Sequence, residues 1–280
     1  MKGAPFASRE PAMPPMPPPE MRFKVSGGRD EEAFDASGVE SVVDFTHAVA
    51  GLGRSLADFP RILEWGCGSG RILRHFPFDP VRQELHGCDI DPEMIAWLGE
   101  AMPELKVAVS GGLPPLPYAD GQFDLIINHS VLTHLDAAYQ DAWLTELKRI
   151  LSPDGVLILT VQGPYALAMW EAELPGGPAA NEAIRAARRA LDETGVHFLA
   201  DDAWAGLFPK YYQSTFHAHW YVFDHWSRWF DIVDYRPRGS LHYQDMVVMR
   251  HKRPGPAPRA LGPGFSFMDK VAWKLGRCPR

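Results

Sequence analysis

The clearest structural signal in this chain is the segment Arg61-Ile62-Leu63-Glu64-Trp65-Gly66-Cys67-Gly68-Ser69-Gly70-Arg71-Ile72-Leu73. A short apolar run meets three closely spaced glycines, and an amphipathic pattern follows. This order is typical of a strand, a sharp turn and a helix, because glycine can adopt a positive φ and lets the backbone approach a ligand. We predict a strand over residues 61–65, a helix from Gly70 to about Phe76, and a small polar or anionic ligand at the turn.

A second landmark is the segment Leu85-His86-Gly87-Cys88-Asp89-Ile90-Asp91-Pro92, which is typical of the end of the next strand. The carboxylate of Asp89 could accept two hydrogen bonds from a ribose diol. Asp91 could equally cap a helix that begins at Pro92. The glycine spacing departs from the dinucleotide pattern G-x-G-x-x-G, which would need glycine where Arg71 stands. The two segments therefore indicate a nucleotide-type site that is not a typical dinucleotide site.

Together these segments resemble the class I S-adenosylmethionine-dependent methyltransferases, and the runs at residues 116–127 and 147–158 are similar to the next blocks of that family. The resemblance covers about residues 40–165. It implies an α/β fold: a seven-stranded, mostly parallel Rossmann-like sheet with helices on both faces. A helical and aromatic insertion is expected before the last two strands.

The apolar pattern predicts alternating strands and helices, which favours a parallel sheet with right-handed crossovers. Strands are expected at residues 61–65, 84–88, 105–109, 123–129 and 156–161, followed by an antiparallel pair at 230–235 and 245–251. Helices are expected at residues 38–56, from Pro92, at about 137–151 and at about 181–193.

Composition divides the chain into three parts. Residues 1–37 begin with a proline-rich stretch and are expected to be a largely disordered tail, because such a composition buries little apolar surface. Residues 38–252 are the expected methyltransferase domain, with its insertion at about 163–221. Residues 253–280 are expected to be a Pro/Gly linker and a basic tail.

Charge and cysteine content exclude several classes of protein. The net charge of −7 over 280 residues argues against a nucleic-acid partner. Three cysteines without a C-x-x-C pair do not make a disulfide framework, so a cytoplasmic setting is expected. No apolar run is long enough for a transmembrane segment. The sequence does not indicate an oligomeric state.

The resemblance implies S-adenosyl-L-methionine as cofactor and S-adenosyl-L-homocysteine as product. The glycine turn would face the methionine part, Glu64 would lie near its ammonium, Asp89 would bind the ribose, and Ile90 would pack on the adenine. Many family members carry a carboxylate after the third strand, but this chain has Ser110-Gly111-Gly112-Leu113 there. The full set of expected cofactor-binding residues is Glu64, Gly66, Cys67, Gly68, Gly70, Asp89, Ile90, Gly112, Leu113, Asn128 and His129.

Histidines are the candidate catalytic bases. His129, after the fourth strand, could act as a base or line the methyl group, or it could belong to a capping and packing segment. His217 and His219 lie in an aromatic cluster at residues 211–221 that could bind the acceptor or simply pack over the sheet. His134 is expected to have a structural or cofactor-lining role. No metal site is expected, because no third ligand accompanies His217 and His219.

Taken together, these features predict a methyltransferase that acts on a small-molecule or glycan-like acceptor, by in-line transfer to oxygen. Arg185, Arg188 and Arg189 could meet an anionic substrate or form a solvated helix face. Two alternatives remain open at this stage. One is an NAD-dependent oxidoreductase, against which Arg71 argues. The other is a non-catalytic S-adenosylmethionine-binding or scaffold protein.

Overall fold

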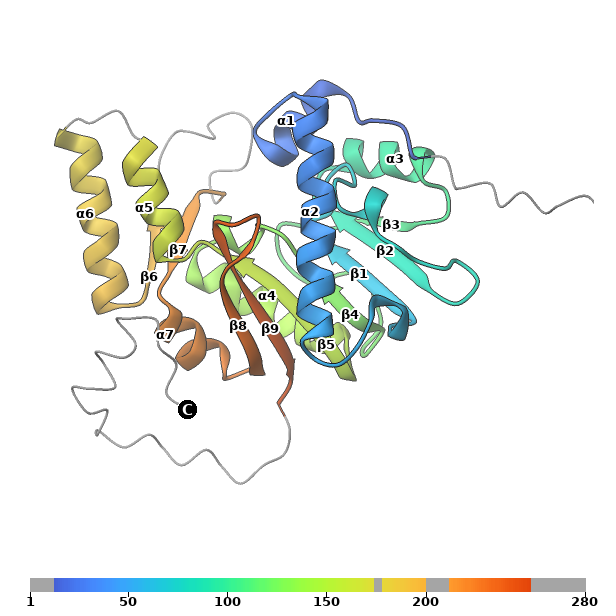
Figure 1. Ribbon diagram of the computed structural model, residues 1–280. Coiled ribbons are helices and arrows are strands. Elements are labelled where there is room, and N and C mark those ends of the chain that lie inside the picture. Colours follow the sequence, from blue (N-terminus) through green and yellow to red (C-terminus); the bar gives the residue numbers. More distant parts are fainter. Residues whose placement is uncertain (1–12, 174–177, 200–211, 253–280) are drawn as a thin grey trace, which may run out of the picture.

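The computed structural model describes residues 13–173, 178–199 and 212–252 (Figure 1). A seven-stranded sheet with the order β3-β2-β1-β4-β5-β9-β8 forms its centre. The strands are β1 (Arg61–Trp65), β2 (Glu84–Asp89), β3 (Lys106–Val109), β4 (Phe123–Ile127), β5 (Leu151–Val161), β8 (Phe230–Ser240) and β9 (Gln244–His251). Strands β1 to β5 pair in parallel, and β9 runs antiparallel to both β5 and β8. The predicted α/β fold is confirmed.

Both faces of the sheet are covered by helices, because successive residues of its central strands are apolar on both sides. Ile62 and Ile158 belong to the core beneath α2 (Glu31–Ala50) and α3 (Pro92–Ala101). Leu63 and Leu157 belong to the opposite core, beneath α4 (Ala137–Ile150) and η4 (Val222–Trp226). Short 3-10 helices lie at η1 (Leu56–Asp58), η2 (Leu73–His75) and η3 (Leu132–His134).

Aspartate side chains cap the N-termini of α2, α3 and α4. The side chain of Asp30 accepts a hydrogen bond from Ala33 N at the start of α2, and Asp136 accepts one from Tyr139 N at the start of α4. Asp91 accepts from Glu93 N and Met94 N at the start of α3, where Pro92 occupies the first turn. Each carboxylate satisfies a backbone N–H that has no partner inside its helix.

The insertion forms a small unit beside the sheet, at the opposite end of the molecule from α3 (Figure 1). It contains α5 (Pro164–Glu173), α6 (Pro178–Glu193), and the antiparallel strands β6 (Val196–Leu199) and β7 (Ser214–His217). Leu167, Ile184 and Phe216 belong to its own apolar core. The one-turn helix α7 (His219–Tyr221) leads from this unit back to the sheet.

The predicted tail over residues 1–37 is wrong for its described part. Residues Pro19–Ser26 form helix α1, and α2 begins at Glu31 rather than at Gly38. Phe34 is fully buried and ties this segment to the rest of the fold. The first 12 residues and the predicted linker and tail at 253–280 lie outside the described residues, as do 200–211 of the insertion.

The helix predicted from Gly70 to about Phe76 is also wrong. The backbone turns repeatedly after β1, and only Leu73–His75 form a short 3-10 helix. Gly70 has a φ of +81°, which is incompatible with an α-helical start. Pro77 follows within two turns, so a helix here would be too short to be stable by itself. A ligand at the turn would therefore meet side chains and turn amides, not a helix N-terminus.

Candidate active site

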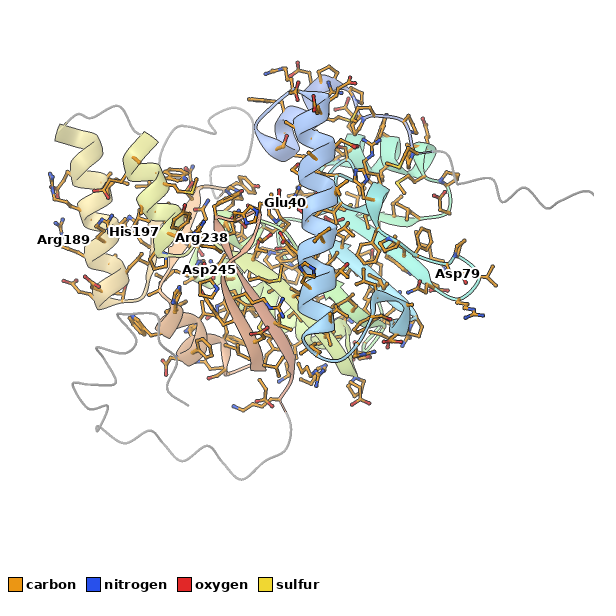
Figure 2. The ribbon with its side chains drawn as sticks, viewed as in Figure 1. Glu40, Asp79, Arg189, His197, Arg238 and Asp245 are labelled. Carbon is orange, nitrogen blue, oxygen red and sulfur yellow. The ribbon has the colours of Figure 1, made fainter. Side chains whose placement is uncertain are left out.

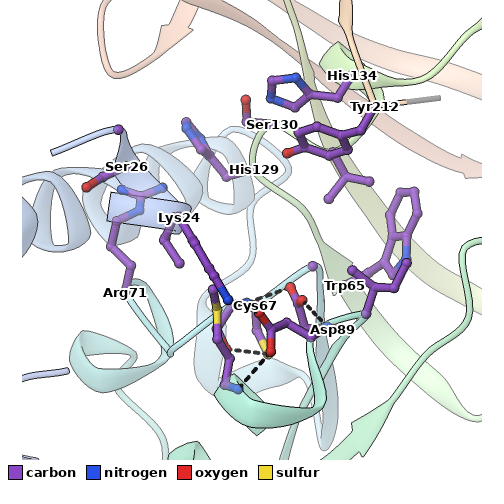
Figure 3. A pocket seen from close by; sticks show the side chains of 18 of the residues that line it. Lys24, Ser26, Trp65, Cys67, Arg71, Asp89, His129, Ser130, His134 and Tyr212 are labelled. Atoms are coloured by element: carbon purple, nitrogen blue, oxygen red, sulfur yellow. Dashed lines mark hydrogen bonds and ion pairs between the residues drawn. The ribbon is translucent and has the colours of Figure 1, made fainter. Parts of the chain in front are cut away.

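A cavity of about 830 Å³ lies at the carboxyl edge of the parallel strands (Figure 3). Open α/β sheets commonly bind ligands at this edge. Its walls come from the loops that follow β1, β2, β3, β4 and β5, together with the segment from Lys24 to Gly28 at the end of α1. Its volume is within the range of cavities that hold small organic ligands.

The glycine turn forms the floor of this cavity. Gly66 and Gly68 have φ values of +76° and +52°, and a Cβ at either position would overlap the side chain of Val131 or Val25. The backbone N–H groups of Gly66 and Cys67 both donate to Cys88 O, at 2.7 and 3.1 Å. The turn is thereby held against the end of β2, and no side chain at these glycines fills the cavity.

Glu64 lies near the end of β1 with its carboxyl group buried. Its Oε2 atom has no hydrogen-bond partner among the described residues. Burial raises the pKa of Glu64 to about 8, although the charge of Arg71 opposes this shift. A buried carboxyl with an unused oxygen is expected to need a donor from a ligand.

Arg71 is a buried cation that lines the same cavity. Its Nη1 donates to Ser37 O at 2.9 Å and to Ser41 Oγ at 3.0 Å, which anchors the guanidinium on α2. No carboxylate of the described residues lies within 4.0 Å of it. A buried charge without a close partner is costly, so an anionic group of a ligand is expected here. Sequence reasoning used Arg71 only to exclude a dinucleotide and missed this position.

Two aspartates at the end of β2 have different roles. Asp89 accepts from Gly68 N through Oδ2 at 2.8 Å and from Asp91 N through Oδ1 at 2.9 Å, and burial raises its pKa. It lines the cavity between Gly68 and Ile90. Asp91 caps α3 and also accepts from Lys24 Nζ at 2.8 Å. The capping interpretation of Asp91 is therefore confirmed.

The loop after β3 supplies small residues. Ser110, Gly111 and Gly112 line the cavity, whereas Leu113 does not and is 51% exposed. Ile90 also lines the cavity and leaves 43% of its surface exposed, which makes it suitable for contact with a flat apolar ring. Among the described residues, the cavity wall at Gly111 and Gly112 offers no carboxylate.

The segment at the end of α1 covers the cavity, a contribution that sequence reasoning missed. Lys24, Val25 and Ser26 line it, and the side chain of Val25 lies over Gly68. The ion pair from Lys24 to Asp91 connects α1 to α3. Pro19 in the first turn of α1 and Gly27 after its last turn are ordinary helix boundary signals, which could have indicated this helix.

Beyond β4 the lining changes character. The charged lining residues are Lys24, Asp30, Glu64, Arg71, Asp89 and Asp91, and we call the part that they line the charged half. A second part of the wall, which we call the neutral half, comes from residues after β4: His129, Ser130, Val131, His134, Leu135, Trp143, Gln162, Trp170, Tyr212, Ser214, Leu241, Tyr243 and Gln244. None of these carries a fixed charge. Figure 3 shows His129, His134 and Tyr212 together on the side away from Asp89.

The two histidines of the neutral half are uncharged at pH 7. Nδ1 of His129 lies 3.1 Å from Ser240 Oγ, and burial together with the charge of Arg71 holds its pKa well below the ordinary value. Nδ1 of His134 donates to Gln213 O at 2.9 Å, and burial lowers its pKa to about 4. The ring of His134 also stacks on Tyr212, with 4.1 Å between centroids.

The structure does not bring His217 or His219 into the cavity. His217 is fully buried, and its Nε2 lies 3.0 Å from Gln140 Oε1. His219 Nε2 lies 2.9 Å from Asp245 Oδ2, which also accepts from Tyr235 OH. Asp245 lies beside Arg238 in the β8–β9 hairpin (Figure 2), where it accepts from Arg238 N. These two histidines stabilise the packing between the insertion and the sheet.

Five further predicted positions have structural contacts instead. Asn128 Nδ2 donates to Trp65 O at 2.6 Å, which ties the end of β4 to β1, and Asn128 does not line the cavity. Gly70 lies against Leu98 outside it. The arginines of α6 pair with glutamates, Arg185 and Arg189 with Glu182 and Arg188 with Glu171, and none of the three lines the cavity. Figure 2 shows Arg189 at the outer end of the insertion.

Comparisons with known proteins agree with this geometry. Residues 63–159 match the family model of a methyltransferase domain. An uncharacterized methyltransferase of Schizosaccharomyces pombe is 29% identical over 142 residues, which cover 45% of this chain and 50% of that protein. The malonyl-[acyl-carrier protein] O-methyltransferase of Enterobacter lignolyticus is 32% identical over 140 residues, covering 48% and 52%. The chain therefore spans about half the length of these relatives.

A solved structure shares the fold. The 1,6-didemethyltoxoflavin-N1-methyltransferase of Burkholderia thailandensis, with bound 1,6-didemethyltoxoflavin and S-adenosylhomocysteine, has a TM-score of 0.50 at 16% identity. The likeness covers 85% of this chain and 92% of that chain. The matched family region contains the end of β1, the glycine turn, β2, β3 and β4. Residues 63–159 therefore form a methyltransferase domain, and the fold is that of the class I S-adenosylmethionine-dependent methyltransferases.

The charged half suits the cofactor of that class, S-adenosyl-L-methionine. Its amino-acid part carries an ammonium and a carboxylate. The cavity offers a buried carboxyl at Glu64 with one unbonded oxygen and, at Arg71, a buried guanidinium with no carboxylate of the described residues within 4.0 Å. Its ribose carries two hydroxyl donors for the carboxylate of Asp89. No group of three or more potential metal ligands occurs in the described ranges. None of the helices in these ranges is both long and apolar enough to span a membrane.

Proposed function

We propose that this domain transfers the methyl group of S-adenosylmethionine to a hydroxyl oxygen of a small-molecule or glycan-like acceptor. The observation that carries the proposal is the division of one 830 Å³ cavity into a charged half and a neutral half. The charged half suits the cofactor, and the continuous neutral half has room for an acceptor beside it. A cavity of this size encloses a small molecule, whereas a macromolecular acceptor would need an open surface.

The proposal assigns the cofactor contacts to particular residues. Glu64 would receive the ammonium, Arg71 the carboxylate and Asp89 the ribose hydroxyls. The backbone of Gly66, Cys67 and Gly68 would face the amino-acid part. Ile90 would pack on the adenine, with Ser110 and Gly112 at its edge. Support comes from the lining of the cavity, from the unbonded Oε2 of Glu64, and from the lack of a carboxylate beside the buried guanidinium of Arg71 among the described residues.

The cofactor supplies a methyl group on a positively charged sulfur, which is already a good electrophile. The task of the protein is to hold the acceptor oxygen in line with the sulfur–carbon bond and to exclude water. As the carbon–oxygen bond forms with an electron pair from oxygen, the sulfur–carbon bond breaks and the sulfur becomes neutral. The hydroxyl proton must leave, and the neutral imidazole of His129 is the candidate acceptor for it.

A labelling experiment tests the proposal. The purified protein would be incubated with methyl-labelled S-adenosylmethionine and separately with a metabolite panel, total RNA and a protein extract. We expect label in the metabolite fraction only. Label confined to RNA or protein would contradict the small-molecule assignment. Binding of S-adenosylmethionine without transfer to any fraction would favour the scaffold alternative.

A further inference from the structure

The neutral half contains two buried polar atoms that the fold leaves unsatisfied. Gln162 follows β5, is only 6% exposed, and its Oε1 has no hydrogen-bond partner among the described residues. Ser214 begins β7, is fully buried, and its Oγ also has none. Both residues line the cavity. Buried polar atoms are almost always paired, so an unpaired oxygen on a cavity-lining residue indicates a hydrogen-bond partner in a ligand. The amide oxygen of Gln162 can only accept, whereas the hydroxyl of Ser214 can donate or accept.

These two atoms come from adjacent segments. Residue 162 forms a bridge with Phe216 of β7, and His217 N donates to Gln162 O at 2.8 Å. Ser214 stands two residues before Phe216, on the same side of the strand. The backbone at both positions is therefore held by strand pairing, and the two side chains are presented on rigid elements.

Aromatic surfaces surround this polar pair. Trp170 lies edge-on to Phe216, with 5.5 Å between ring centroids, and also lines the cavity. The stacked rings of His134 and Tyr212 form part of the same half, as Figure 3 shows. Such surfaces favour a flat or apolar ring over a flexible polar chain.

We infer that the acceptor is an uncharged, ring-containing molecule with a second N–H or O–H donor, which bonds to Gln162 Oε1 and lies beside Ser214 Oγ. This inference rests on the proposed function and names its substrate class. A carboxylate placed here would be desolvated without a cation of its own, since no cationic side chain of the described residues is bonded to Gln162 or Ser214. It would also face the lone pairs of Gln162 Oε1. Gln162 is thus a specificity-determining residue that favours neutral donors.

The test measures binding, so that it does not depend on methyl transfer. Protein saturated with S-adenosylhomocysteine would be titrated with matched phenols: 4-hydroxybenzamide, methyl 4-hydroxybenzoate and 4-hydroxybenzoate, and with a fragment library of amide and acid pairs. The amide is neutral and has a second donor, the ester is neutral without one, and the acid is anionic. We expect the amides to bind most tightly and the acids at least about tenfold more weakly.

Three variants locate the effect. In Gln162→Leu the advantage of amide over ester is expected to vanish, while S-adenosylhomocysteine binds as in the parent protein and reports correct folding. In Gln162→Arg the preference is expected to turn toward the acid. Ser214→Ala should weaken the amide by a smaller factor. Acids that bind as well as amides in the parent, unchanged ratios in Gln162→Leu, or no fragment binding at all would each overturn the inference.

Failure of this inference is distinguishable from failure of the proposed function. If acids bind and are methylated, methyl transfer to small molecules stands and only the acceptor class is wrong. If amides bind at Gln162 but no acceptor is methylated, the subsite stands and the transfer proposal is wrong.

Discussion

The backbone N–H of Gly68 donates a hydrogen bond to Oδ2 of Asp89 over 2.8 Å, and this bond joins the glycine turn to the end of β2. Both oxygens of Asp89 are oriented by backbone N–H groups, because Oδ1 accepts from Asp91 N. The carboxylate is therefore fixed in position before a ligand arrives. Remaining acceptor capacity on these oxygens is available to the cavity.

Replacement of Asp89 tests its proposed ribose contact. We expect Asp89→Ala to weaken S-adenosylhomocysteine by roughly 10- to 100-fold, since hydrogen bonds to a charged group contribute about 1.5–3 kcal/mol. Calorimetric titration measures the affinity. Asp154→Ala, at an exposed position in β5, is the matched control and should bind as the parent does. An equal affinity in both variants would contradict the assignment.

Arg71 is expected to bind the cofactor carboxylate. Arg71→Met should weaken S-adenosylhomocysteine by roughly 10- to 100-fold, for the same energetic reason. It should change the affinity for 5′-methylthioadenosine, which lacks the amino-acid part, by less than about threefold. The comparison of the two ligands separates a local contact from general damage to the site. If both ligands weaken equally, Arg71 acts on the shape of the cavity instead.

Because the pKa of Glu64 is raised, we expect the affinity for the cofactor to depend on pH. The Glu64 pKa of about 8 leaves the carboxyl mostly protonated at pH 7 in the free protein. A bound ammonium favours the carboxylate, so binding lowers this pKa and releases a proton. Affinity should therefore rise as pH increases from 6 toward 7, by up to about tenfold per pH unit.

Calorimetry in two buffers with different ionisation enthalpies counts the released protons. The parent should release close to one more proton at pH 7 than Glu64→Gln, which cannot titrate. Because the free cofactor is the same in both titrations, its own ionisation cancels in the difference. Equal proton release would show that Glu64 keeps its protonation state on binding.

The ion pair between Lys24 and Asp91 should slow release of the cofactor. Lys24→Ala removes one link between α1 and α3 and is expected to raise the dissociation rate about 2- to 5-fold, because partly exposed pairs contribute up to about 1 kcal/mol. Stopped-flow displacement measures this rate. Arg29→Ala breaks the exposed pair with Glu20 outside the cavity and should leave the rate unchanged. Added salt should reduce the difference between parent and Lys24→Ala.

If His129 is the base, we expect methyl transfer to continue to an unusually low pH. The pKa of His129 lies well below the ordinary histidine value, so the imidazole stays neutral as pH falls through 6.5. The rate of methyl transfer should therefore decline only at a lower pH. His129→Ala should reduce kcat by about 10²- to 10⁴-fold if the imidazole accepts the proton. His225→Ala, which alters a histidine bonded to Asp141 away from the cavity, is the control.

The sheet could be predicted from the sequence because strands and turns depend mainly on residues that are close together in the chain. The apolar strand residues and the glycines after β1 act on their immediate neighbours, and the structure has the strand and the turn as predicted, although not the helix expected from Gly70. The two cores are likewise anticipated by continuous apolar strands such as β4. Val39 and Val43 are apolar residues of α2 that are 45% and 44% exposed, so an apolar residue in a helix is not by itself a core position.

Site residues that depend on tertiary packing could not be predicted in this way. His217 and His219 stand two apart in an aromatic segment, but β7 ends between them, so neither faces the cavity. Gln162 has no motif around it, and its role depends on the approach of β7. Helix α1, which covers the cavity, was not predicted because a proline-rich stretch precedes it. Such positions follow from how distant segments meet.

The roof that Val25 and Lys24 form over the glycine turn also affects protein production. A shortened version that starts at residue 63, where the family match begins, would lack α1 and α2. It would expose the apolar surface that Phe34 and Phe45 now cover and would remove the anchor of Arg71 on Ser37 and Ser41. Expression trials should therefore retain every residue from Pro14 onward, since Pro14 O already accepts from Arg74.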